Sequence, residues 1–433
     1  MSASPFYLRG NFAPVEEEVG AFDLKVEGEI PESLNGLFLR NGPNPTRGDP
    51  GHWFLGDGMI HGTRVEEGRV SWYRNRYVDT ATLRGAPAMA MTDDLKFDHS
   101  VGVSNTHVVT HADKIFALVE SSFPCELDRE LNTVGPTDFD GKLTTSFTAH
   151  PKICPKTGEM VAFGYSAIAP LLTYHRVSAS GEMVQSDVIE VGAPTMIHDF
   201  SVTENYVIFM DLPVLFKPEQ LAAGIPYAWD ESYGARLGVM PRNGTNEDVV
   251  WIEIDPCYVF HPMNAFERDG KIVMNVARYP QYMSADSSAS LTRWTIDLAA
   301  RVVKEEALDD RPIEFPRIDP RREGQENRYG YTVQTGAGKD LSFSSLLKYD
   351  LETGGCEVHD FGAGNSPSEP VFVPTGADED EGVVMAYVHH ADTNSSEFIA
   401  LDAQNFSAPP VARVALPQRV PFGFHGSWSA DPS

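Results

Sequence analysis

The chain has 433 residues, a formal net charge of −28, and a composition that is 42% hydrophobic and 10% aromatic. This acidic balance excludes a nucleic-acid-binding protein, which needs a basic surface, and attachment to anionic lipid through a polybasic segment. Residues 1–7 lack the apolar centre of a signal peptide, and no apolar run reaches the roughly 18 residues of a membrane span. We therefore expect a cytoplasmic protein.

Short runs rich in Val, Ile, Phe and Tyr recur along the chain between turn residues, a pattern that predicts β-strands. Residues 156–159 and 268–271 have the sequences of hairpin turns. Helical periodicity is limited to residues 217–223 and 287–298. Many short strands with few helices predict an all-β sandwich, barrel or propeller. The clearest strand-like runs are 114–120, 159–164, 206–210, 271–276 and 382–388.

Nothing in the composition marks a boundary between domains, since Gly and Pro are spread throughout. The cysteines are widely spaced without a Cys-x-x-Cys pair, so we expect reduced thiols rather than a disulfide framework. They are Cys125, Cys154, Cys257 and Cys356. A propeller can absorb this length in one closed ring of blades, and we expect a single domain over residues 1–433.

Four histidines stand in distinctive local sequences. They are His150 in SFTAHPK, His198 in MIHDF, His261 in FHPMNAF and His425 in PFGFHGSW. Neutral imidazole is a ligand for zinc, copper, nickel and iron. Their separations of 48, 63 and 164 residues mean that one helix or hairpin cannot bring them together. A lone buried histidine is more often a core residue than a ligand, so the spacing alone does not identify a metal site.

These flanking sequences resemble those of the carotenoid cleavage oxygenases, a family that includes stilbene-cleaving enzymes and retinoid isomerases. The resemblance runs over nearly the whole chain. It includes GEIPESLNGLFLRNGPNP at 28–45, WFLGDGMIHG at 53–62 and SEPVFVP at 368–374. It implies an all-β, seven-bladed β-propeller with the metal on its axis and a small helical and loop cap over a substrate tunnel. It also implies one Fe(2+) per chain, bound by His150, His198, His261 and His425, and dioxygen as co-substrate.

The resemblance also assigns residues around the iron. Glu120, Glu314 and Glu369 are expected to accept hydrogen bonds from His198, His261 and His425, and His150 is left without a glutamate partner. Carboxylates in this position orient the imidazole rings and offset the metal charge. Thr106 lies fourteen residues before Glu120, as in some relatives where a threonine crowds one open iron position. A β-branched strand residue is the alternative interpretation of Thr106.

The reaction implied is oxidative cleavage of a carbon–carbon double bond into two carbonyl products. Stilbene-cleaving relatives place a lysine immediately before the glutamate equated with Glu120. This chain has Val119 there, which favours an apolar carotenoid or apocarotenoid over a hydroxystilbene. A stilbenoid-cleaving enzyme, a non-catalytic iron-containing binding protein and a retinoid isomerase remain alternatives. The apolar stretches 167–174 and 212–216 predict peripheral membrane contact at the tunnel mouth, with core packing as the alternative, and no protein partner is inferred.

Overall fold

The computed structural model describes residues 4–284, 287–336 and 342–432. Within these ranges the helical segments are 3₁₀-helices of three to six residues. They are η1 (Phe6–Leu8), η2 (Gly10–Phe12), η3 (Trp53–Leu55), η4 (Pro218–Ala223), η5 (Glu231–Tyr233), η6 (Asn246–Asp248), η7 (Pro320–Arg322) and η8 (Ala403–Asn405). All other regular structure is β, as the sequence predicts.

The chain divides into two compact units. The first comprises residues 1–140, 344–346 and 357–433, and the second comprises residues 141–343 and 347–356. Each is described separately below. The expectation of one domain stays a prediction.

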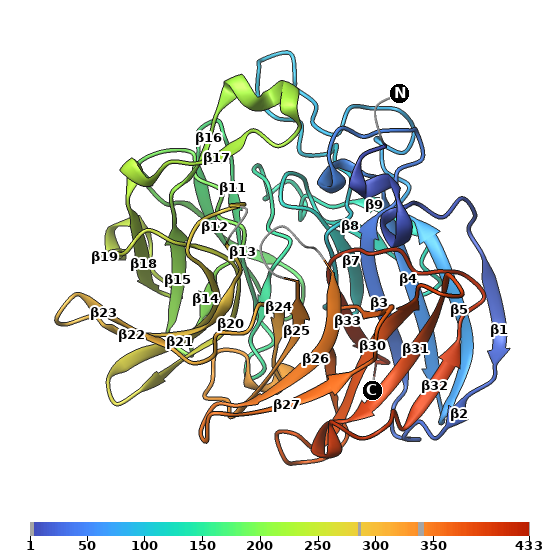
Figure 1. Cartoon of the computed structure of the whole chain (residues 1–433). Coiled ribbons are helices and arrows are strands. Elements are labelled where there is room, and N and C mark those ends of the chain that lie inside the picture. The colour runs from blue at the N-terminus through green and yellow to red at the C-terminus, as the bar shows by residue number, and fades with distance from the viewer. Residues whose placement is uncertain (1–3, 285–286, 337–341, 433) are drawn as a thin grey trace. The chain divides into compact units, whose positions relative to one another are not determined.

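Three sheets make up most of the first unit (Figure 1). In the first sheet, a strand from late in the chain, β33, pairs with β3 from near its start. In order across the sheets, the strands are β1 (Gly20–Leu24), β5 (Arg69–Tyr77), β4 (Gly58–Glu66), β3 (Gly36–Pro43) and β33 (Gly426–Ala430); β6 (His107–His111), β7 (Lys114–Leu118), β8 (Cys125–Leu127) and β9 (Thr133–Pro136); and β2 (Glu27–Gly28), β32 (Ala412–Ala415), β31 (Ser395–Asp402), β30 (Gly382–His390) and β28 (Asn365–Pro367), with β29 (Val371–Pro374) also on β30.

The second unit contains three further four-stranded sheets and one two-stranded sheet. The four-stranded sheets are β10 (Lys152–Ile153), β11 (Met160–Tyr165), β12 (Leu172–Val177) and β13 (Met183–Val188); β14 (Ser201–Val202), β15 (Tyr206–Asp211), β18 (Ala235–Pro241) and β19 (Val250–Ile254); and β20 (Tyr258–Arg268), β21 (Lys271–Tyr279), β22 (Ser290–Asp297) and β23 (Val302–Ala307). The small sheet pairs β16 (Val214–Phe216) with β17 (Tyr227–Trp229).

A seventh sheet of four strands begins in the second unit. Its strands are β24 (Ile313–Arg317), β25 (Tyr329–Thr335), β26 (Phe343–Asp350) and β27 (Gly355–Asp360). Including this sheet, the described residues form seven sheets of four or more strands, the number expected for a seven-bladed propeller.

Local sequence accounts for the strands and turns that were predicted. The five strand-like runs correspond to β7, β11, β15, β21 and β30, although β7 ends at Leu118, two residues before Glu120. Between β20 and β21, Arg268 pairs directly with Lys271. The two intervening residues, Asp269 and Gly270, have φ of 51° and 74°. Positive φ at both positions is the requirement of a type I′ hairpin turn, and an Asp-Gly pair meets it readily.

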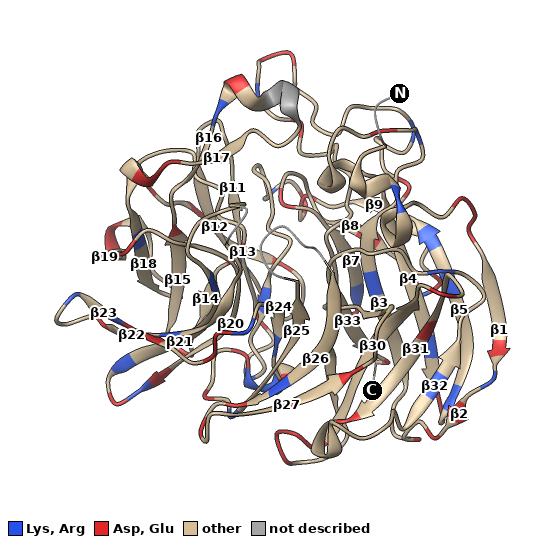
Figure 2. Cartoon of the chain, viewed as in Figure 1, with Lys and Arg blue, Asp and Glu red and all other residues tan. Residues whose placement is uncertain are grey.

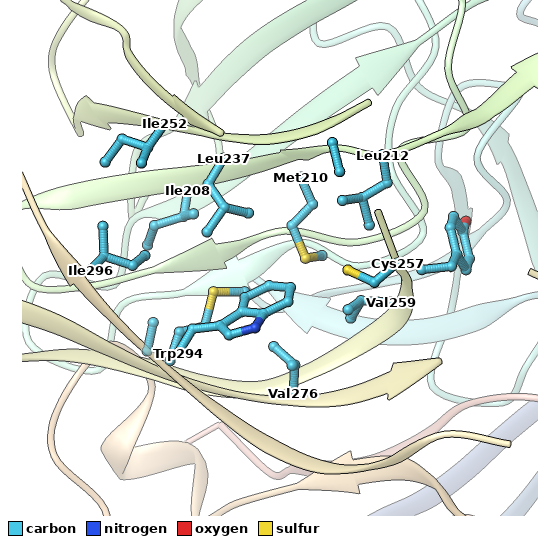
Figure 3. Packing of buried hydrophobic residues seen from close by; sticks show 14 of the residues in the cluster. Ile208, Met210, Leu212, Leu237, Ile252, Cys257, Val259, Val276, Trp294 and Ile296 are labelled. Atoms are coloured by element: carbon cyan, nitrogen blue, oxygen red, sulfur yellow. The ribbon is translucent and has the colours of Figure 1, made fainter. Parts of the chain in front are cut away.

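The predicted helix over residues 287–298 is wrong, because this segment contains β22. Leu291, Trp294 and Leu298 recur at a spacing that also fits a helix, but Trp294 and Ile296 alternate as strand residues do. Both are buried in a core cluster of the second unit that also contains Met210 and Val276 (Figure 3). Strand β22 pairs with β21, so its backbone bonds lie within the sheet. The predicted helix at 217–223 corresponds to η4, and its role as a cap stays a prediction.

Acidic segments recur along both units, interspersed with single basic residues (Figure 2). In the part of the chain that the structure describes, no helix is long and apolar enough to cross a membrane. The four cysteines are free thiols, as expected from their spacing.

Candidate metal centre

Three of the four predicted ligands belong to the second unit, each on or just before the first strand of a sheet. His150 lies two residues before β10, His198 lies three residues before β14, and His261 is the fourth residue of β20. The spacing of 48 and 63 residues is therefore the length of chain between successive sheets. His150 and His261 are buried, and His198 is partly buried.

The Nε2 atoms of these three histidines converge. Nε2 of His198 lies 3.1 Å from Nε2 of His150 and 3.2 Å from Nε2 of His261. Imidazole nitrogens bind metals at about 2.0–2.1 Å, which places two neighbouring ligands about 3 Å apart. Three imidazole edges directed at one another are therefore a donor set that fits a metal ion. Imidazole ligands suit iron, zinc, copper or nickel.

The opposite nitrogen of His261 is held by Glu314, as the resemblance predicted. His261 Nδ1 lies 2.6 Å from Oε2 of Glu314, which also accepts from the Phe315 N–H at 2.8 Å. The Tyr279 hydroxyl donates to Oε1 at 2.8 Å. Burial and the Glu314 carboxylate raise the pKa of Tyr279 well above its usual value, so Tyr279 remains a donor. An acceptor at Nδ1 assigns the proton to that nitrogen and leaves the Nε2 lone pair available.

The fourth predicted ligand, His425, lies in the first unit immediately before β33. Its Nδ1 is 2.9 Å from Oε1 of Glu369, and the Gly426 N–H donates to Oε2 of Glu369 at 2.7 Å. Glu369 and His425 are 4% and 3% exposed. The contact predicted between Glu369 and His425 is therefore present, with the same Nδ1-to-carboxylate arrangement as in the pair of His261 and Glu314.

A buried arginine stands behind Glu369. Arg40 is opposite Gly426 in the pairing of β3 with β33, and its Nη1 donates to the Pro421 carbonyl at 2.8 Å. Burial lowers the pKa of Arg40 to about 10, while the charge of Glu369 acts in the opposite direction. The signature sequence at 28–45 thus supplies a positive charge close to the carboxylate that holds His425.

The structure leaves two predicted residues with less defined roles. Glu120 is partly buried and follows β7, and its partnership with His198 stays a prediction. Thr106 is buried, and its carbonyl accepts from the His425 N–H at 3.1 Å. Thr106 therefore lies beside a predicted ligand, and the crowding of an iron position by its side chain stays a prediction.

Two functional candidates were missed in the sequence. Tyr279 ends β21, three residues beyond the predicted strand-like run 271–276, and it donates to Glu314. Asp199 directly follows His198 and lies close to His150. The signal for Asp199 was present in the motif MIHDF, since an acidic residue beside a candidate ligand is a possible partner for another ligand.

Comparison with known proteins identifies the family. Residues 12–430 match the family described as retinal pigment epithelial membrane protein. A carotenoid cleavage oxygenase from Mycobacterium tuberculosis is 41% identical, and the match covers 98% of this chain and 97% of that protein. The chain belongs to the carotenoid cleavage oxygenase family.

Solved structures of carotenoid cleavage oxygenase relatives match along the chain. A lignostilbene dioxygenase of Pseudomonas brassicacearum is 29% identical with a TM-score of 0.89, and the match covers 100% of both chains. A cobalt-substituted apocarotenoid oxygenase of Synechocystis is 28% identical with a TM-score of 0.85, covering 96% of this chain and 97% of that chain. The predicted fold class is confirmed: the seven sheets are the blades of an all-β, seven-bladed β-propeller.

Proposed function

We propose that this chain is a non-haem iron dioxygenase that cleaves a carbon–carbon double bond of a carotenoid or apocarotenoid into two carbonyl products. The observation that carries the proposal is the convergence of three Nε2 atoms at 3.1–3.2 Å in a chain that matches a carotenoid cleavage oxygenase over 98% of its length. One Fe(2+) per chain and dioxygen as co-substrate are part of the proposal, as is a position of the metal on the propeller axis.

The proposed ligands are His150, His198, His261 and His425. These four histidines are the candidate ligand set among the described residues. The inclusion of His425 is supported by its pairing with Glu369, which repeats the pairing of His261 with Glu314. Four neutral imidazoles leave the full charge of a divalent ion in place, and the carboxylates behind them offset that charge.

The chain's own residues prepare this site for the reaction. Bound ferrous iron would supply the centre at which dioxygen is activated for attack on the alkene. Glu314 holds the proton of His261 at Nδ1, so that the lone pair of Nε2 is available to bind the metal. The rings of Phe260 and Phe315 pack against His198 and His261 at 5.2 and 5.4 Å between ring centroids. These aromatic faces give the ligands apolar neighbours, which limits the access of water to that side of the imidazoles.

A stilbenoid is the second candidate substrate, favoured by the match to a lignostilbene dioxygenase. Val119 argues against it. This partly buried side chain offers no charge to a phenol, and an unpartnered buried hydroxyl costs about 1–3 kcal/mol. This is about a 5- to 150-fold handicap for a hydroxystilbene against an apolar polyene of similar contact area.

The experiment is to incubate the ferrous protein with carotenoids, apocarotenals and stilbenes under oxygen and to identify products by mass. We expect two carbonyl products from an apocarotenoid and a higher kcat/KM for that class. Val119→Lys should shift the ratio of kcat/KM values toward hydroxystilbenes. A wild-type protein that prefers the hydroxystilbene would reverse the ranking of substrates, and an absence of cleavage in every class would contradict the proposed reaction.

Peripheral membrane contact through the two apolar stretches also remains a proposal. Ile168 is 40% exposed, and Leu215 and Phe216 are partly exposed. Leu212 and Val214, however, are buried in the core cluster of the second unit. These two residues therefore pack in the core, as the alternative interpretation expected. Contact with a membrane would depend on the exposed side chains alone.

A further inference from the structure

The second unit contains a carboxylate that faces the outward nitrogen of His150. While Nε2 of His150 points at His198, its Nδ1 lies 3.8 Å from Oδ2 of Asp199. Asp199 is 2% exposed and His150 is 5% exposed. This is the same orientation as in His261, whose Nε2 points at His198 and whose Nδ1 faces Glu314.

Asp199 is fixed in place by two other groups. Its Oδ1 accepts from the Phe200 N–H at 2.7 Å, and Lys152 Nζ lies 2.9 Å from Oδ1 and 3.2 Å from Oδ2. The Lys152 ammonium also lies 5.9 Å from the centre of the Phe200 ring. A buried carboxylate needs such partners, and here they fix its rotamer beside His150.

Other charges act near the pair of Lys152 and Asp199. Burial raises the pKa of Glu323, and the charge of Asp199 adds to that shift, whereas the charges of Lys152, Arg317 and Arg242 oppose it. A carboxylate close to an imidazole favours a cationic complex there, so Asp199 can interact favourably with a metal bound at His150.

We propose that Asp199 is the carboxylate that stabilises a metal complex at His150 through its charge, whereas Glu314 holds His261 by a direct hydrogen bond. The proposal rests on the proposed function, because it concerns the retention of the metal. At 3.8 Å, Asp199 acts on His150 through charge rather than through a direct hydrogen bond. Both of its carboxylate oxygens also lie within 3.2 Å of the Lys152 ammonium group.

The test measures release of cobalt(II) from the loaded full-length protein to an excess of chelator, together with the thermal midpoint of the metal-free protein. Asp199→Asn should accelerate cobalt release by about 10- to 100-fold. Asp199→Glu, which keeps the charge, should restore release to within about threefold of the wild type, a range that normal side-chain adjustment covers. Lys152→Met, which frees the carboxylate for His150, should not accelerate release.

Glu159→Gln is the matched control. Glu159 is another largely buried carboxylate of the second unit, bound to Arg176 and Arg242. Its replacement should lower the thermal midpoint and leave cobalt release unchanged. Should Asp199→Asn not fold, Asp199→Ser, which also removes the charge, takes its place: accelerated cobalt release supports the proposal, and release at the wild-type rate overturns it.

The outcomes separate this inference from the proposed function. Cobalt release from Asp199→Asn at the wild-type rate, with a lower thermal midpoint, would show that Asp199 has only a structural role. Equal acceleration by Asp199→Asn and Lys152→Met would assign the effect to their ion pair and would also overturn the inference. A wild-type protein that retains neither iron nor cobalt would instead overturn the proposed function.

Discussion

The two histidine–glutamate pairs share one geometry but differ in what surrounds the carboxylate. In the second unit, Glu314 is bound by neutral donors, the Tyr279 hydroxyl and the Phe315 N–H. In the first unit, Glu369 is bound by the Gly426 N–H and lies in the field of the buried Arg40. The first arrangement orients a carboxylate, whereas the second also balances its charge. Replacement of the two glutamates should therefore have unequal consequences.

Removal of a ligand is the largest perturbation of either pair. His261→Ala and His425→Ala should each reduce iron from one per chain to a small fraction, because the remaining imidazoles no longer complete the ligand set. Both variants should keep a β-rich circular dichroism spectrum, since the sheets pack without the metal. Metal analysis of the purified proteins is the measurement, and full iron in His425→Ala would exclude His425 as a ligand.

Replacement of the two glutamates by glutamine tests the difference directly. Both variants should weaken metal retention or turnover by roughly 10–100-fold, because the carboxylate charge is lost. Glu369→Gln should also destabilise the metal-free protein more than Glu314→Gln does, since the buried Arg40 then loses the favourable charge of Glu369.

Urea unfolding of the metal-free variants measures this stability difference. The double variant Arg40→Met with Glu369→Gln should be less destabilised than the sum of the two single variants. Additive losses would mean that Arg40 and Glu369 are not coupled. Equal losses for the two glutamine variants would remove the distinction between the pairs.

The Tyr279 hydroxyl provides a smaller test in the second unit. Tyr279→Phe removes one of the hydrogen bonds to the Glu314 carboxylate. It should lower the free energy of unfolding by about 1.5–3 kcal/mol, the range for hydrogen bonds to charged groups. Metal retention should fall less than in Glu314→Gln, because the carboxylate still accepts from His261. If Tyr279→Phe lost as much metal as Glu314→Gln, Tyr279 would have a direct role in metal retention.

A last expected effect is a dependence of stability on acid, with one buried histidine in each unit. Burial and the charges of Arg40 and Arg419 lower the pKa of His61 to about 3, and burial lowers that of His175 to about 4. Unfolded histidine binds a proton near pH 6.5, so the unfolded state binds more protons below that pH. Each histidine should therefore remove about 1.4 kcal/mol of stability per pH unit below 6.5, until its folded pKa is reached.

Urea unfolding at pH 7 and pH 5 measures this slope. His61→Gln and His175→Gln should each flatten it by the contribution of one group. Variants with the wild-type slope would show that these histidines are protonated without loss of the fold.

The family motifs predicted which histidines and glutamates would be in contact at the site. The contacts of His261 with Glu314 and of His425 with Glu369 follow from such motifs. The alternation of strand and turn residues predicted five of the strands, namely β7, β11, β15, β21 and β30. Trp294 was misassigned because its spacing from Leu291 and Leu298 fits both helical and extended structure. Tyr279 was missed because its importance arises from folding, which brings it beside Glu314. Asp199 adjoins the candidate ligand His198 in the sequence, but its contact with His150 also depends on folding.

The pairing of β33 with β3 also has a consequence for the order of events during synthesis. The two strands are separated by roughly 380 residues, so at ribosomal rates β3 waits roughly 20–80 s for its partner. Until then β3 lacks the neighbour that covers one side of it, and His425, which directly precedes β33, is not yet in place. With His425 as a proposed ligand, we expect the metal to be loaded after translation, and a chain that stops before β33 lacks both the strand and its adjoining histidine.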